Sequence, residues 1–244
     1  MWECDPNGVE PAVVRPALGV FKHEAACVDR QTGFVYLTED LADGGFYRFK
    51  PRRRGDLSEG VLQIATVGSS GLVDWIRVPD PEGGSANPTR RQVAGSTEFR
   101  RGEGIWFDSG IVYVATTADS KIQAYDTRSR RLRLVYDAAR LEQPPLTDVD
   151  NITVARSGDL FVCEDDGGDD PFDIGIITRR PNRRVARFLK VTNDGPFQHG
   201  GGGSEASSEL AGVVFNPTGN RLYFASQRAN VTGVVFEVRG PFRG

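Results

Sequence analysis

Short apolar runs, separated by polar turn clusters, dominate the chain. The runs hold four to seven residues and are rich in Val, Ile, Phe and Tyr, and clusters of Gly, Asn, Asp and Pro divide them. A helical pattern is indicated only over Asp137–Glu142, where Pro144 and Pro145 follow and end it. The pattern predicts an all-β protein.

One internal repeat accounts for much of this pattern. Each copy has an acidic residue, a short apolar strand, a turn with Gly, a second strand and a polar end. The four copies are Glu24–Asp40, Glu103–Thr117, Asp150–Asp165 and Glu209–Gln227. Their turn glycines, Gly33, Gly110, Gly158 and Gly219, follow the leading acid by nine, seven, eight and ten residues. Glycine supplies the positive φ that a tight hairpin turn needs.

Further strands are expected between the copies, over Gly45–Lys50, Gln123–Asp126 and Arg131–Asp137. A unit of this kind, recurring every ~40–80 residues, is typical of the four-stranded blades of a β-propeller. A β-sandwich would explain the number of strands, but not the acid that begins each copy. We therefore expect one β-propeller domain over residues 1–244. The stretches Pro79–Glu98 and Asn193–Ser208, with His199 exposed in the second, are interpreted as flexible insertions.

Composition narrows the possible chemistry. A formal charge of −3 gives no reason to expect a nucleic-acid partner, and no run approaches the ~18 apolar residues of a membrane span. There are 33 carboxylates but only two His and three Cys, which favours a hard cation over zinc. Cys4, Cys27 and Cys163 are odd in number and far apart, so no disulfide framework is expected, and Cys27 and Cys163 are interpreted as buried apolar residues.

The repeated acids could form a metal site. The first strand of each propeller blade lines the central axis, so Glu24, Glu103, Asp150 and Glu209 would form a ring of carboxylates. Glu39 and Asp40, and Glu164 and Asp165, would add to it from the ends of second strands. Carboxylates gathered in this way repel one another unless cations such as Ca²⁺ or trivalent iron bind between them. The alternative for any single acid is a solvated turn residue.

Basic residues offer one further candidate. Arg101 precedes Glu103 by two residues, which on a strand places both side chains on one face. A guanidinium beside metals could hold phosphate oxygens in a bidentate manner, or it could pair with one of the acids. The other basic runs are interpreted as solvated loops; they are Arg52–Arg54, Arg179–Arg180 and Arg183–Arg184.

Taken together, these segments resemble the PhoX-type alkaline phosphatases. The resemblance lies in five segments, which follow the order of that family and span nearly the whole chain. They are Phe21–Phe49, Arg101–Phe107 with Val112–Thr117, Asp150–Ile152, Leu160–Gly167 and Glu209–Gln227. Several unusual acidic motifs recur together here, which makes the resemblance specific.

The resemblance implies a periplasmic or secreted six-bladed β-propeller that hydrolyses phosphate monoesters at a cluster of iron and calcium ions. It implies that Arg101 contacts the phosphate, with Asp40, Asn151 and Asp165 as weaker candidates around the metals. The implied metal ligands are Glu24, Glu39, Glu103, Asp150, Glu164 and Glu209.

Two features of such proteins have no counterpart in the sequence. One is an export signal and the other is an upstream segment with an iron-ligating Cys followed by two Glu. We therefore expect a propeller that is incomplete at its N-terminus, and activity that this loss could abolish. The alternatives are a non-catalytic calcium-binding propeller and a lactonase-like propeller hydrolase. The sequence leaves the natural substrate and the oligomeric state open.

Overall fold

The structure is a computed structural model that describes residues 1–165, 173–179, 183–191, 209–227 and 233–243. Its regular elements are almost all β-strands, as predicted, and the helices among the described residues are short 3-10 turns. None of these helices is long and apolar enough to cross a bilayer. Contacts along the chain divide it into two compact units, one of Met1–Val112 with Ala124–Arg133 and one of Tyr113–Gln123 with Leu134–Gly244.

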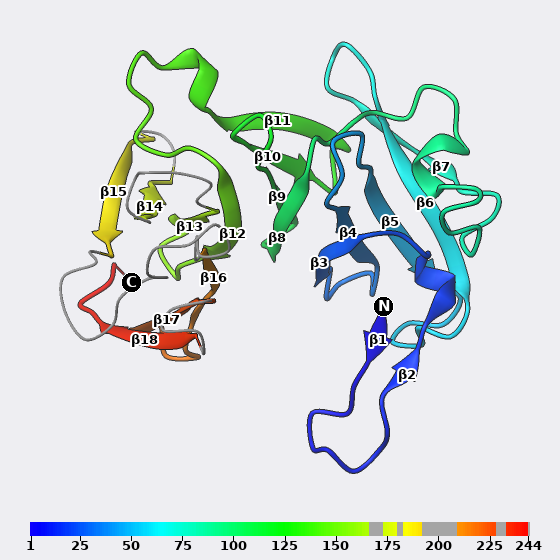
Figure 1. The fold of residues 1–244 in the computed structure, drawn as a ribbon, viewed down its shortest axis with the longest axis horizontal. Coiled ribbons are helices and arrows are strands. Elements are labelled where there is room, and N and C mark those ends of the chain that lie inside the picture. Colours follow the sequence, from blue (N-terminus) through cyan, green and yellow to red (C-terminus); the bar gives the residue numbers. More distant parts are fainter. Residues whose placement is uncertain (166–172, 180–182, 192–208, 228–232, 244) are drawn as a thin grey trace, which may run out of the picture. The chain divides into compact units, whose positions relative to one another are not determined.

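The main sheet of the first unit is an antiparallel meander of five strands in chain order (Figure 1). Two features flank it: a small ribbon of β1 (Trp2–Glu3) and β2 (Val13–Val14), and the turns η1 (Pro16–Leu18) and η2 (Thr89–Arg91). The five strands are β3 (His23–Val28), β4 (Val35–Glu39), β5 (Phe46–Pro51), β6 (Gly60–Val67) and β7 (Val73–Arg77). The sequence predicted four strands per sheet, and β7 is the addition.

Three more sheets repeat the meander. One of them is the four-stranded sheet of β8 (Gly102–Asp108), β9 (Ile111–Thr116), β10 (Lys121–Asp126) and β11 (Arg131–Asp137). The second unit holds β12 (Val149–Val154), β13 (Leu160–Glu164), β14 (Asp173–Ile177) and β15 (Val185–Lys190), and then β16 (Leu210–Phe215), β17 (Arg221–Ser226) and β18 (Val234–Arg239). The fold class is therefore all-β and of the propeller-blade type. The number of blades stays a prediction.

Local signals in the sequence correctly located the hairpins. Gly33, Gly110, Gly158 and Gly219 all have positive φ, between 72° and 87°, in the turns that close the predicted strand pairs. The helical pattern near Asp137 corresponds to η3 (Ala138–Arg140), where the Asp137 carboxylate accepts a hydrogen bond from the Ala139 amide. Such side-chain caps satisfy amide groups at the start of a helix.

Each unit has its own apolar core. In the first unit, side chains of β4, β5 and β6, with Leu18 and Val78, enclose Tyr47 and Phe49. In the second unit, Phe161 and Cys163 of β13 pack against Leu222 and Phe224 of β17. Burial of this apolar surface fixes the strands, and so fixes the residues at the strand ends.

Candidate functional site

A β-bulge places Glu24 on the first strand of its sheet. In the β3–β4 pair the register is regular at His23–Glu39 and again at Ala26–Leu37, and the extra residue falls between them. A bulge redirects the side chains next to it and is common beside active sites. Glu24 is accordingly exposed at the start of β3, whereas the matching second strand is buried throughout.

Glu103 lies close to Glu24, although 79 positions separate them in the sequence. Their carboxylate oxygens come within 4.8 Å of one another. Thr38 links their strands. Its hydroxyl accepts a hydrogen bond from the Ala25 amide at 3.1 Å and donates one to the Glu103 carbonyl at 2.5 Å. Because Glu103 is only 4% exposed, two like charges meet here in a partly dehydrated place.

Arg101 is bound to two acids of this cluster. Its Nε donates to Asp40 at 2.8 Å and its Nη2 donates to Glu103 at 3.0 Å. The expected shared face with Glu103 is therefore correct, but Arg101 itself precedes β8 and has a φ of 50°. The ion pair that the sequence left as one of two alternatives is present.

Asp40 is the second acid that Arg101 contacts. Its other partner is Lys22, whose ammonium group lies 2.5 Å from the carboxylate. Burial by itself would raise the pKa of Asp40, but the hydrogen bonds from Lys22 and Arg101 outweigh it and the pKa is lowered. We call Glu24, Asp40 and Glu103 the acidic cluster of the first unit.

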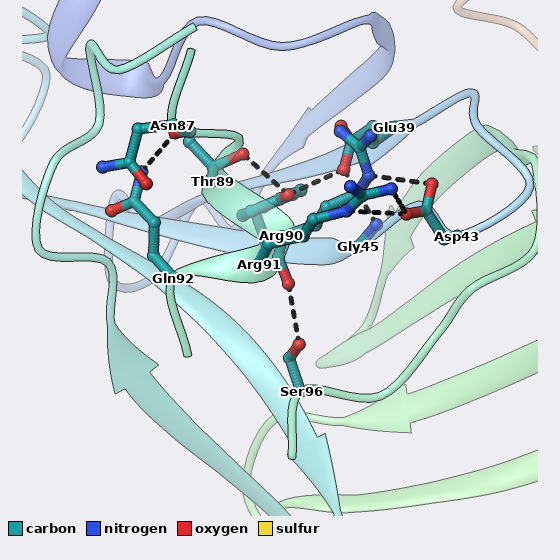
Figure 2. A network of polar contacts seen from close by, with 10 residues as sticks. Glu39, Asp43, Gly45, Asn87, Thr89, Arg90, Arg91, Gln92 and Ser96 are labelled. Atoms are coloured by element: carbon teal, nitrogen blue, oxygen red, sulfur yellow. Dashed lines mark hydrogen bonds and ion pairs between the residues drawn. The ribbon is translucent and has the colours of Figure 1, made fainter. Parts of the chain in front are cut away.

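Glu39 is fully buried and is held by protein donors. One carboxylate oxygen accepts from the Gly45 amide at 3.0 Å and the Tyr47 hydroxyl at 2.7 Å, and the other accepts from Arg90 at 3.0 Å. Arg90 and Arg91 both pair with Asp43, so the network extends to the surface (Figure 2). Such partners offset the cost of burying a carboxylate.

Arg90 was not among the residues predicted from the sequence. The stretch 79–98 was interpreted as a flexible insertion, yet it places Arg90 on Glu39 and buries Thr89 completely against the Tyr47 hydroxyl. Arg90 is 51 residues from its partner, and one strand-and-turn pattern cannot reveal a contact at that separation. The predicted surface position of Arg52–Arg54 is correct, since all three are exposed.

The second unit repeats the bulged geometry. In the β12–β13 pair the register shifts between Val149 and Ile152, and the bulge contains Asp150 and Asn151. The Asn151 amide group donates to Asp150 at 2.6 Å, and its oxygen accepts from the Gly212 amide of β16 at 2.7 Å. Asn151 thus orients Asp150, which is 4% exposed, and ties β12 to β16.

Glu164 has the same register position as Glu39. Val149 pairs with Glu164 just as His23 pairs with Glu39, and each pair stands immediately before the bulge that carries an acid. Glu164 is 9% exposed and accepts the Thr147 amide at 2.6 Å. Two sheets therefore have the same arrangement, with one acid in the bulge and a glutamate across from the preceding residue.

Glu209 has a different position from the other leading acids. Its backbone carbonyl accepts a hydrogen bond from the Gln227 amide. In the other two sheets the carbonyls of Lys22 and Asp148 accept the equivalent bonds, from the amides of Asp40 and Asp165. Glu209 is therefore the counterpart of Lys22 and Asp148. In the β16–β17 pair, Leu210 faces Ser226, so Ser226 has the place that Glu39 and Glu164 have in theirs. Counting residues from the turn glycine could not reveal this offset.

Strained backbone precedes two of the acids. Arg101 and Asp148 have φ values of 50° and 42°, and each stands two residues before an acid, Glu103 or Asp150. A residue with a side chain in this left-handed region costs about 1–2 kcal/mol. Such strain is retained where the surroundings fix the backbone, and it is frequent at functional sites.

The available donors suit a hard cation. Around each bulge they are carboxylate oxygens, with the Asn151 amide in addition, and this set fits Ca²⁺. The cysteines are free, as predicted, and burial raises the pKa of both Cys27 and Cys163, so neither is a ready thiolate ligand for iron. Cys163 is fully buried and Cys27 is half-buried. His199 lies outside the described residues.

Several solved structures resemble the chain at low identity. A streptogramin B lyase structure shares 16% identity at a TM-score of 0.46, with 92% of this chain and 57% of that chain covered. A luciferin-regenerating enzyme shares 14% identity at a TM-score of 0.43, with 92% of this chain and 94% of that chain covered. A putative 6-phosphogluconolactonase from Bacteroides uniformis shares 10% identity at a TM-score of 0.45, with 90% of this chain and 68% of that chain covered. The chain thus spans little more than half of the lyase.

Sequence families give a more specific result. No curated protein matches the chain. The family model described as alkaline phosphatase PhoX matches residues 1–133 and 133–230, which is nearly the whole sequence. The chain belongs to the PhoX alkaline phosphatase family.

Proposed function

We propose that the chain is a metal-dependent phosphomonoesterase of the PhoX kind. The observation that carries the proposal is an arrangement that occurs in two sheets of a chain of this family: an acid lies in a bulge, and a buried glutamate faces the residue before that acid. The acids are Glu24 and Glu39 in one sheet and Asp150 and Glu164 in the other. Protein donors hold Glu39 and Glu164, and the bulge acid in each sheet adds a carboxylate that a cation could neutralise. The proposed ligands are Glu24, Glu39, Glu103, Asp150, Glu164 and Glu209.

Calcium is the cation that these donors favour, and iron is proposed from the family alone. When bound, such ions polarise the phosphoryl oxygens and offset their charge. The residues of the chain would then orient the ester. Arg101 presents a planar guanidinium that Asp40 and Glu103 hold in place, and we propose that it contacts the phosphate. We further propose that the protein acts in the periplasm or outside the cell, where PhoX-type enzymes are found.

The test is hydrolysis of a chromogenic phosphate monoester at alkaline pH by the purified chain. We expect turnover that a chelator abolishes and that Ca²⁺ restores. Arg101→Met should lower kcat/KM by about a hundredfold or more, since a charge-assisted contact to the transition state is lost. Arg52→Met, at an exposed arginine that pairs with Glu59, is the control and should leave turnover unchanged. Absence of phosphate release with Ca²⁺ and iron supplied would refute the proposal.

A second candidate is a calcium-binding propeller without catalysis. The observation that favours it is that Arg101 already donates to both Asp40 and Glu103, which is a stabilising arrangement in itself. In that case Ca²⁺ raises the melting temperature, because it binds only the folded state, while neither a phosphate ester nor a lactone is hydrolysed. Lactone turnover without phosphate release would instead identify the lactonase-like alternative.

A further inference from the structure

A cavity in the first unit lies at the opposite end of β3 from the acidic cluster. Its volume is about 390 Å³, within the range of small-molecule sites. Its walls are the β3–β4 turn, Arg48 of β5 and the turns at Ser109–Ile111 and Asp126–Arg128. Asp29 of this cavity follows Glu24 by five residues, so the two sites are about 16 Å apart along an extended strand.

Arg48 is the central cation of this cavity. The guanidinium carbon lies 4.7 Å from the ring centre of Trp75 and 5.3 Å from that of Phe34. Its Nε and Nη2 both donate to the Gln63 side-chain oxygen, at 3.1 and 2.8 Å, and this acceptor is neutral. Within the described ranges no carboxylate forms an ion pair with Arg48. A half-buried guanidinium without a counter-charge favours a bound anion.

Other donors surround Arg48. Tyr36 is buried, and burial raises its pKa, so the hydroxyl keeps its proton and can donate it to a ligand while it accepts from Arg48. Arg128 lines the cavity and is exposed. Lys50 adds positive charge, since its ammonium lies 5.8 Å from the ring centre of Phe34.

The two carboxylates in the cavity wall are already engaged. Asp29 is 2% exposed and accepts from the Gln31 amide at 2.8 Å and the Thr32 hydroxyl at 2.7 Å. Asp126 accepts from the amides of Arg128 and Ser129, at 3.0 and 2.9 Å, and its other oxygen lies 3.8 Å from Arg133. Both acids close their own turns, and Arg133 offsets the charge of Asp126. Arg48 and Arg128 therefore outnumber Asp29, which keeps its charge because its donors are neutral.

We infer that this cavity binds a small organic oxyanion, with its carboxylate or phosphonate-like group at Arg48 and Tyr36 and its apolar body against Phe34. The shared chemistry is a planar or tetrahedral group of oxygens, for which an arginine fork is the usual partner. The inference concerns a site separate from the acidic cluster. It requires no metal and does not depend on phosphatase activity.

Calorimetric titration of the whole chain, in the presence of a chelator, tests this. Benzoate and phenylphosphonate are the anionic probes, and benzamide is the neutral probe of the same shape. We expect both anions, or one of them, to bind at least about tenfold more tightly than benzamide, because only they carry charge to the guanidinium. The tighter anion identifies the preferred head group. Equal affinity for benzamide, or no binding of any probe in the millimolar range, would overturn the inference.

Variants then locate the bound anion. Arg48→Lys keeps the charge but removes the planar fork, and Arg128→Met removes an exposed charge without disturbing the core, so each should weaken anion binding by about tenfold. Arg52→Met and Arg91→Met, at exposed arginines outside the cavity wall, should bind the anion like the wild type. Should Arg48→Lys fail to fold, Arg128→Met still decides. Wild-type affinity in Arg128→Met, or loss of binding in Arg91→Met, would place the anion elsewhere.

Discussion

Glu24 and Glu103 hold carboxylate oxygens within 4.8 Å of one another, on two strands that the Thr38 hydroxyl links. Two like unit charges at about 4 Å repel by about 1 kcal/mol even in water, and by more where water is partly excluded. Arg101 offsets part of this repulsion, because it forms an ion pair with Glu103. A cation between the two carboxylates would turn this repulsion into attraction.

Glu24→Gln should reduce the stabilisation that calcium gives. We expect Ca²⁺ to raise the melting temperature of this variant by less than that of the wild type, since one ligand is lost. Thermal unfolding of both proteins, in chelator and with Ca²⁺, measures the two rises. An equal rise in both proteins would mean that Glu24 does not bind calcium.

The fold could be predicted largely because its signals are local. A hairpin needs only alternating strand residues and a glycine with positive φ, and Gly33, Gly110, Gly158 and Gly219 supplied that signal. The fifth strand, β7, was missed because its residues Val73–Arg77 follow no second repeat of the acid-and-turn pattern. The pairing of β7 with β6 depends on contacts in the folded protein and not on a local sequence signal.

The sequence located the acids but could not predict how each is held. Glu39, Glu103, Asp150 and Glu164 are buried and Glu24 is exposed, and their role as metal ligands stays a prediction. The register of Glu209 could not be predicted, because a bulge adds a residue to one strand and breaks any count from the turn. The contact of Arg90 with Glu39 could not be predicted either, since it joins a loop to a strand across 51 residues.

The neighbours Arg90 and Arg91 should differ sharply in importance. Arg90→Met leaves the fully buried Glu39 carboxylate without its counter-charge, and we expect a loss of about 3 kcal/mol in the free energy of unfolding. Arg91 is 67% exposed and pairs only with Asp43 among the described residues, so Arg91→Met should change stability by no more than about 0.5 kcal/mol. Urea denaturation in chelator compares the two. Equal effects would mean that Glu39 does not depend on Arg90.

Glu237 should make stability depend on pH in the acid range. Hydrogen bonds from Tyr223 and then Arg239 lower the pKa of this exposed carboxylate from 4.5 to about 2. A lowered pKa in the folded state stabilises the protein above the unfolded value, and this contribution is lost as the pH falls from 4.5 towards 2. The urea midpoints of the wild type and Glu237→Gln should therefore differ at neutral pH and converge through that range.

Ionic strength and the Tyr223 hydroxyl provide controls for the Glu237 prediction. The difference in urea midpoint between the wild type and Glu237→Gln should shrink at high ionic strength, because the Glu237 carboxylate is exposed to solvent. Tyr223→Phe removes the shortest hydrogen bond to Glu237, at 2.6 Å. In the Tyr223→Phe background, the Glu237→Gln change should therefore shift the urea midpoint at neutral pH by less than it does in the wild type. A gap that persists unchanged down to pH 2 would mean that ionisation of Glu237 is not its source.

Two buried threonines offer a matched test of how the acidic cluster is held. Thr38 and Thr153 are both fully buried, and the Thr38 hydroxyl bridges Ala25 and Glu103. The Thr153 hydroxyl, in contrast, has no hydrogen-bond partner among the residues that the structure describes. Thr38→Val keeps the shape and leaves the Ala25 amide and the Glu103 carbonyl without this partner. We expect a loss of about 1–3 kcal/mol in the free energy of unfolding.

Thr153→Val should be neutral or stabilising by up to about 1 kcal/mol, because an unsatisfied buried hydroxyl is replaced by a methyl group. Thr38→Ser, which keeps the bridging hydroxyl, should recover most of the stability lost in Thr38→Val. If Glu24 and Glu103 bind calcium together, Thr38→Val should also reduce the Ca²⁺-dependent rise in melting temperature, since the two strands lose their link. Equal destabilisation by both valine variants would mean that packing, and not the bridge between β3 and β8, is what Thr38 supplies.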